Sequence, residues 1–136
     1  MAERVYDDVV TRRTISPAVR ANGTVNGVAV DRAANGGAEE AIVVVTTGTI
    51  TDGSHAVAVE DSDDGSTGWV AVPAGQLTGT PPTIADVNDD AIYEIGVAGS
   101  RRYLRVSVVT TGATSGGAFS AVIVLGGSRF SPASHS

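Results

Sequence analysis

The sequence predicts an all-β protein: an antiparallel sandwich, jelly-roll-like, or a small barrel, with an extended N-terminal arm. Seven or eight short segments rich in Val, Ile and Thr are separated by turns that contain Gly, Asn or Asp. The 17 glycines favour tight turns over helices, and no segment shows a convincing helical period. The 136 residues suffice for one domain with a real core and are too few for two.

Residues 1–23 differ from the rest of the chain. They mix charges, contain Pro17 and follow neither a two-residue nor a helical period. Apolar side chains such as Val10 and Ile15 would serve little purpose in a tail that never docks. We therefore expect an arm that is poorly ordered alone and becomes ordered on a partner, the alternative being a disordered tail without a role.

A single β domain is expected over residues 24–136. Its first predicted strand is the loosely alternating segment 24–30. Residues 39–50 follow with a continuous apolar centre, which is typical of a strand covered on both faces. The Asp52-Gly53 pair favours a hairpin turn, because glycine supplies the positive φ that such turns require. Two short strands, residues 55–62 and 68–72, come next.

Residues 75–90 contain two prolines and are predicted to form a long loop, a natural interaction surface. The last three predicted strands are residues 91–97, 102–112 and 118–126.

The strand at residues 102–112 concentrates positive charge. Alternation places Leu104 and Val106 on a core face, and Arg101, Tyr103 and Arg105 on a polar face. Arginine pairs with carboxylates through a planar fork and also stacks on tyrosine. Two interpretations follow. The arginines form ion pairs within the chain, with Glu94 or with an acidic loop, or they contact a second subunit.

Charge is strongly segregated along the chain, whose net charge is −6. Residues 36–96 hold eleven acids and no Lys or Arg, whereas residues 97–136 hold four arginines and no acid. This pattern suits pairing of acidic loops with an arginine-bearing strand, within one subunit or between neighbours. No sustained basic face is present, so we expect no nucleic-acid partner.

The chain has no cysteine, which excludes thiol catalysis and disulfides. Residues 1–14 lack the apolar core of a signal peptide, and no apolar run approaches the ~20 residues that span a bilayer. We expect a protein that is assembled in a reducing cytoplasm and has no membrane partner.

Catalytic and metal-binding patterns are weak, and we expect no catalytic residue, cofactor or metal. Asp52, Ser54 and His55 are neighbours in sequence, whereas a triad needs groups that converge from separate elements. The acidic segment 60–65 fails the ligand spacing of a calcium hand. Together with residues 85–90 it offers oxygen ligands for weak Ca²⁺ binding, although solvated acidic turns explain both segments as well.

Residues 95–132 carry a family resemblance. The segment IGVAGSRRYLRVSVVTTGATSGGAFSAVIVLGGSRFSP is similar to the C-terminal half of small all-β head proteins of tailed bacteriophages. The upstream hairpin TGTITDG is also similar, and the resemblance extends over residues 27–132. The sequence departs from the family pattern at Val97, where an aromatic is usual, and at Ser128, where proline is usual. The matching positions are Gly96, Gly99, Arg102, Tyr103, Arg105, Leu125, Gly126, Arg129 and Pro132.

The resemblance implies a capsid decoration, or cement, protein on the outer surface of the virion. Such a protein bridges capsomers, binds the major capsid protein and is generally a homotrimer with a docking arm. The residues predicted for the subunit interface are Arg101, Arg102, Tyr103 and Arg105. The residues predicted for the capsid-docking arm are Tyr6, Arg12, Arg13, Ile15 and Arg20. The alternatives are a head-fibre base, a head-completion or tail protein, and a carbohydrate-binding sandwich.

Overall fold

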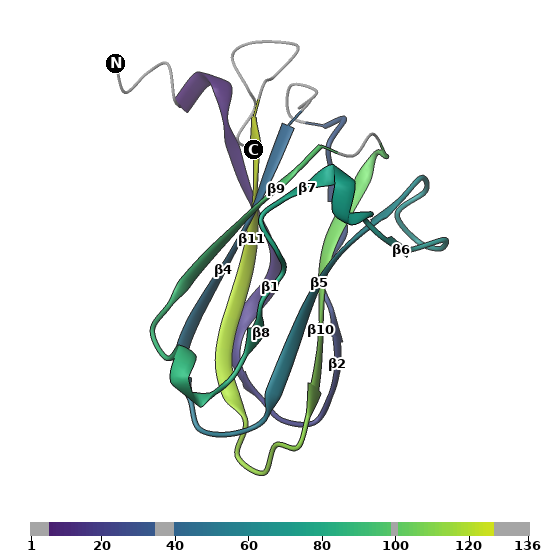
Figure 1. Cartoon of the computed structure of the whole chain (residues 1–136). Coiled ribbons are helices and arrows are strands. Elements are labelled where there is room, and N and C mark those ends of the chain that lie inside the picture. Colours follow the sequence, from purple (N-terminus) through teal and green to yellow (C-terminus); the bar gives the residue numbers. More distant parts are fainter. Residues whose placement is uncertain (1–5, 35–39, 99–100, 127–136) are drawn as a thin grey trace.

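The computed structural model describes residues 6–34, 40–98 and 101–126, which form two antiparallel β-sheets packed face to face (Figure 1). We name each sheet after a central strand. The β11 sheet has the order β1 (Val10–Arg20), β11 (Gly117–Gly126), β4 (Glu40–Ile50), β9 (Ile92–Val97) and β7 (Leu77–Thr78). The β10 sheet has the order β2 (Gly23–Asn26), β10 (Tyr103–Thr111), β5 (Ser54–Ser62) and β6 (Val70–Ala71), with β3 (Val30–Asp31) also on β10 and β8 (Thr83–Ile84) also on β5.

The strand order is that of a jelly roll. The first strand pairs with the last, β1 with β11, and β2 and β3 pair with the last strand but one, β10. On their other sides, β11 pairs with β4 and β10 pairs with β5. This nesting of two Greek keys confirms the all-β, jelly-roll-like sandwich, and the sheets do not close into a barrel.

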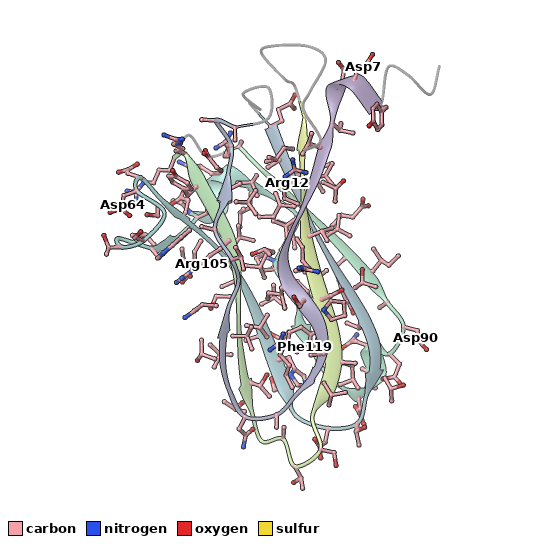
Figure 2. The ribbon with its side chains drawn as sticks, turned by 180° about the vertical axis from the view of Figure 1, so that it is seen from behind. Asp7, Arg12, Asp64, Asp90, Arg105 and Phe119 are labelled. Carbon is pink, nitrogen blue, oxygen red and sulfur yellow. The ribbon has the colours of Figure 1, made fainter. Side chains whose placement is uncertain are left out.

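Aliphatic side chains from both sheets fill the space between them. Burial alternates along β11, so that Ile123 and Leu125 point inward while Val122 and Val124 point outward. Phe119 supplies the largest buried side chain and lies between the sheets (Figure 2). A core dominated by valine and isoleucine suits strands, because β-branched side chains pack well on a pleated surface.

The expected arm at residues 1–23 is corrected for the described part of that segment. Residues 10–20 form β1, an integral strand of the β11 sheet, and Ile15 is only 2% exposed. Register shifts fall between Arg13 and Ile15 and between Ile15 and Ala18. These bulges interrupt the two-residue period, so the strand pattern is hidden in the sequence, and the second one accommodates Pro17, which has no N–H to donate.

Thr14 ties β1 to the opposite sheet. Its Oγ1 donates to the carbonyl oxygen of Val28 at 2.9 Å and accepts from the Val106 N–H at 3.3 Å. The Val28 N–H in turn donates to the Thr14 carbonyl oxygen at 2.7 Å. The boundary that we predicted between residues 23 and 24 therefore does not separate an arm from the domain, because β1 contributes to the core.

Two further expectations need correction. β4 is not covered on both faces: its burial alternates, and the outward-facing Ile42 is 42% exposed. The segment 75–90 is not an irregular excursion either, since it contains β7, β8 and the short 3₁₀ helices η1 (Ala74–Gln76) and η2 (Asp86–Asn88).

Candidate functional site

The arginine strand β10 carries the candidate interface, at the end of the sandwich where the β5–β6 loop projects (Figure 1). Arg105 lies in register with Glu60 on β5, and its Nε donates to Glu60 Oε1 at 2.8 Å. The same guanidinium lies 4.3 Å from the ring centroid of Trp69. Arg105 is thus held by a cross-strand ion pair on one side and a cation–π contact on the other.

Arg102 forms a two-pronged ion pair. Its Nε and Nη2 donate to the two carboxylate oxygens of Asp31, each at 2.8 Å, and its guanidinium lies 5.1 Å from the Tyr103 ring centroid. The hydrogen bonds from Arg102 hold the pKa of Asp31 below its ordinary value. The pair joins β10 to β3 at the rim of the sheet.

Arg101 faces the acidic β5–β6 loop. Its Nε lies 3.8 Å from Asp61 Oδ1 and 3.9 Å from Asp63 Oδ1. Asp61 is buried, and burial raises the pKa of its carboxyl group, with the charge of Arg101 acting in the opposite direction. The Arg32 guanidinium, also buried, donates to the backbone carbonyl of Arg101 at 3.2 Å.

The structure therefore brings Arg101, Arg102, Tyr103 and Arg105 together and supplies carboxylate partners from the same chain. The partners are Asp31, Glu60, Asp61 and Asp63, and not Glu94, which lies on β9 of the other sheet. The Arg101 and Arg102 side chains remain 41% and 54% exposed. A contact between these residues and a second subunit stays a prediction.

The residues predicted for capsid docking separate into two groups. Ile15 is corrected, because its side chain belongs to the core and is not available to a partner. Arg20 is half-buried, donates to the Ser16 carbonyl and lies 6.0 Å from the Phe119 ring centroid. Tyr6 and Arg13 are exposed, and Arg12 is half-buried near the same end of β1 (Figure 2). Docking through these residues also stays a prediction.

Asp52, Ser54 and His55 form no catalytic arrangement. His55 is fully buried, with Nδ1 2.7 Å from Thr110 Oγ1 and Nε2 3.1 Å from the Asp52 carbonyl oxygen. Since a carbonyl can only accept, Nε2 carries a proton, and Nδ1 shares a hydrogen bond with the Thr110 hydroxyl. The Asp52 carboxylate instead accepts the N–H groups of Thr114, Ser115 and Gly116, which fixes the β10–β11 turn.

The two acidic segments do not converge on a calcium site within the chain. Figure 2 shows Asp64 and Asp90 near opposite ends of the sandwich. Asp64 is occupied with its own loop, accepting the N–H groups of Ser66 and Thr67 and the Thr67 hydroxyl, and these bonds lower its pKa. Across the described residues, no three His, Asp or Glu side chains gather as metal ligands, and no helix is long and apolar enough to cross a membrane.

Sequence reasoning missed one surface, the outward face of the β11 sheet. Ile42 and Val44 on β4 lie beside Val122 and Val124 on β11, and all four point away from the core. The signal was present in the unbroken apolar runs of β4 and β11. The β4 run was interpreted as burial on both faces, whereas both runs instead have one buried face and one aliphatic outward face.

The fold defines the protein as a jelly-roll sandwich, and two solved structures have a similar arrangement. The crystal structure of the PBSX exported protein XepA matches with a TM-score of 0.59 and 15% identity, over 85% of this chain. This chain spans only 36% of XepA. A protein of the Bacillus endospore appendages, described as disulfide-linked pili, matches with a TM-score of 0.51 and 16% identity, over 88% of each chain. These likenesses establish the fold alone.

No family model and no curated protein matches the sequence. The present chain has no cysteine, so it lacks the disulfide chemistry named for those pili.

Proposed function

We propose that the chain is a structural protein of a phage virion, and specifically a decoration protein on the outer capsid surface. The observation that carries the proposal is the resemblance of residues 95–132 to small head proteins of tailed phages. A jelly-roll sandwich whose described residues form no catalytic arrangement is consistent with a mechanical role. The low-identity likeness to XepA adds the fold and nothing more.

The mechanism would be multivalent bridging. Many copies would each contact two neighbouring capsomers of the major capsid protein. Expansion of the DNA-filled head would then have to break these additional contacts. Because contacts on a capsid act together, each of them can be weak. Tyr6 and Arg13 are the exposed members of the predicted docking set and are the first candidates for contact with the capsid.

The copy number in purified virions tests the proposal. Quantitative mass spectrometry against the major capsid protein should find hundreds of copies per particle, and capsids that lack the protein should rebind it. About a dozen copies or fewer would point to the second candidate, a head-fibre base, head-completion or tail protein. Absence from the particle would overturn both candidates.

The predicted homotrimer is part of this proposal and has its own test. Arg101 is the best-placed contact, because its guanidinium is exposed and its carboxylates lie at 3.8 and 3.9 Å, longer than those of Arg102 and Arg105. Light scattering should give a mass of three chains, or of six if trimers also pair, for the wild type and a lower mass for Arg101→Glu. A wild-type monomer would contradict the trimer.

A further inference from the structure

The two outward faces of the sandwich differ in chemistry. On the β10 sheet, cross-strand polar pairs occupy much of the face: Arg105 with Glu60, and Ser107 Oγ with Asn26 Oδ1 at 2.9 Å. Its apolar part is smaller, with the exposed Val109 lying opposite Ala56. On the β11 sheet, the centre of the outward face is aliphatic. An antiparallel sheet that faces water normally alternates apolar-in with polar-out, so this departure marks an interaction surface.

The strand register arranges the outward face of the β11 sheet in rows. One row runs Arg13, Val122, Val44, Glu94, from β1 through β11 and β4 to β9. The next row runs Thr11, Val124, Ile42, Gly96. In the first row an aliphatic centre is therefore flanked by a positive charge on β1 and a negative charge on β9.

Arg13 and Glu94 cannot neutralise each other within one chain. Three strand spacings separate β1 from β9, about 14 Å at 4.8 Å per spacing. Two outward glycines also hollow the face: Gly96 and Gly126 line a shallow groove of about 520 Å³, together with Val9, Ile42 and Val124. The surface thus combines an aliphatic centre, opposite charges at its two flanks and a hollow beside it.

We propose that this face packs against the same face of a second copy of the chain, about a two-fold axis parallel to the strands. Rotation about that axis leaves each residue row at the same height along the strands, but it reverses the order of the strands across the sheet. Val122 then lies over the partner's Val44, and Val124 over the partner's Ile42. Arg13 meets the partner's Glu94, and Thr11 meets the partner's Gly96, which has no side chain to obstruct it.

Charge selects this axis over the alternative. The alternative two-fold axis lies between the sheets and runs perpendicular to the strands. It places each strand over the same strand of the partner, so it brings the Arg13 side of one chain against the Arg13 side of the other. Like charges across an interface disfavour such an arrangement. The parallel axis creates two Arg13–Glu94 pairs, and stacked sheets about 10 Å apart leave both long side chains room to meet.

The area suffices for a specific dimer. β1, β11 and β4 each extend about 34 Å and the six residues of β9 about 20 Å, which at about 4.8 Å per strand gives about 590 Å² per partner. The total of about 1,200 Å² lies at the lower end of the range of standard specific interfaces. The contact uses the sheet opposite the Arg101–Arg105 cluster. It occupies Arg13, so that Tyr6 is left as the exposed candidate for capsid contact in such a dimer.

A reciprocal charge swap tests the proposal on the full chain. Mass is measured by analytical ultracentrifugation at 1–100 μM for wild type, Arg13→Glu, Glu94→Arg and the double variant, all at low salt. Asp86→Arg is the matched control, since it makes the same charge change as Glu94→Arg at an exposed site on η2, outside both the arginine cluster and the proposed interface. Circular dichroism confirms that each variant is folded.

The expected result is a wild-type dimer, or a hexamer if the proposed trimer also forms, with a two-fold contact that is at least tenfold weaker in each single swap and recovers in the double swap. Recovery requires an intermolecular pair, because the two residues are too far apart within one chain. A hexamer whose two-fold contact responds in the same way also supports the proposal. A wild-type monomer or trimer overturns it, as does a double swap that dissociates as much as the single swaps. These outcomes concern the contact between two copies, and the copy number in purified virions tests capsid binding separately.

Discussion

Replacing Ile15 by alanine distinguishes a core strand from a docking arm. The substitution removes three carbons from a side chain that is 2% exposed, so nearly the full transfer free energy is lost. At about 0.8 kcal/mol per buried methylene this is about 2.4 kcal/mol, and an incompletely collapsed cavity raises it to about 3 kcal/mol. For a chain of 136 residues, about 3.5 °C of Tm per kcal/mol gives a loss of about 10 °C.

Val19→Ala is the matched control, because Val19 lies on the same strand and is 69% exposed. It should change the free energy of unfolding by no more than about 0.5 kcal/mol. Urea denaturation and thermal melting of the isolated protein provide both measurements. If Ile15→Ala melts within 2 °C of Val19→Ala, a threshold well below the shift expected from the buried side chain, then β1 is not packed in the core and the docking-arm interpretation of residues 10–20 returns.

Three further predictions follow from single contacts. Asp52→Asn should destabilise the protein at pH 7 and less at pH 3. The N–H groups of the β10–β11 turn lower the pKa of Asp52, so its stabilisation is fully present above the ordinary carboxyl pKa and is lost progressively as pH falls from that value through the lowered one. Equal losses in urea melts at both pH values would contradict this. Thr14→Val should cost about 1–3 kcal/mol by denaturation, because the Val28 carbonyl loses the hydroxyl donor that ties β1 to the β10 sheet; an unchanged midpoint would refute it. A double-mutant cycle with Trp69→Ala and Arg105→Ala should give a coupling free energy of about 0.5–1 kcal/mol, whereas additive losses would show that the stacking contributes nothing.

The strands that sequence reasoning located correctly are those with an unbroken two-residue period. β11 alternates in burial along its whole length, and β5 and β10 pair with each other without a register shift, so the ends of all three were predicted to within one or two residues. β1 was missed because its bulges break the period. β4 was located, but the environment of its outward face was not: valine and isoleucine at every position look the same whether a second layer covers them or solvent does.

The candidate site was likewise predictable from the sequence only in part. Alternation alone separates Leu104 and Val106 from Tyr103 and Arg105, so the polar face of β10 was readable in advance. Which carboxylate meets which arginine was not, because Asp31 and Glu60 reach β10 only through the strand order. The same order places Arg13 and Glu94 in one row although 80 residues separate them in sequence.

The sequence by itself determined the fold class, the positions of several turns and the inward-facing residues of the regular strands, because these follow from local periodicity and turn chemistry. It did not determine what each turn connects: the predicted Asp52-Gly53 hairpin was wrong, because that turn carries the chain from β4 in one sheet to β5 in the other. Only the tertiary structure decided that residues 10–20 close the β11 sheet, that the arginines of β10 find carboxylates in their own chain, and that an aliphatic face flanked by Arg13 and Glu94 remains uncovered by the described chain. The physical reason is that strand pairing joins segments far apart in sequence, and a local pattern records which side of a strand is apolar without recording what lies against it.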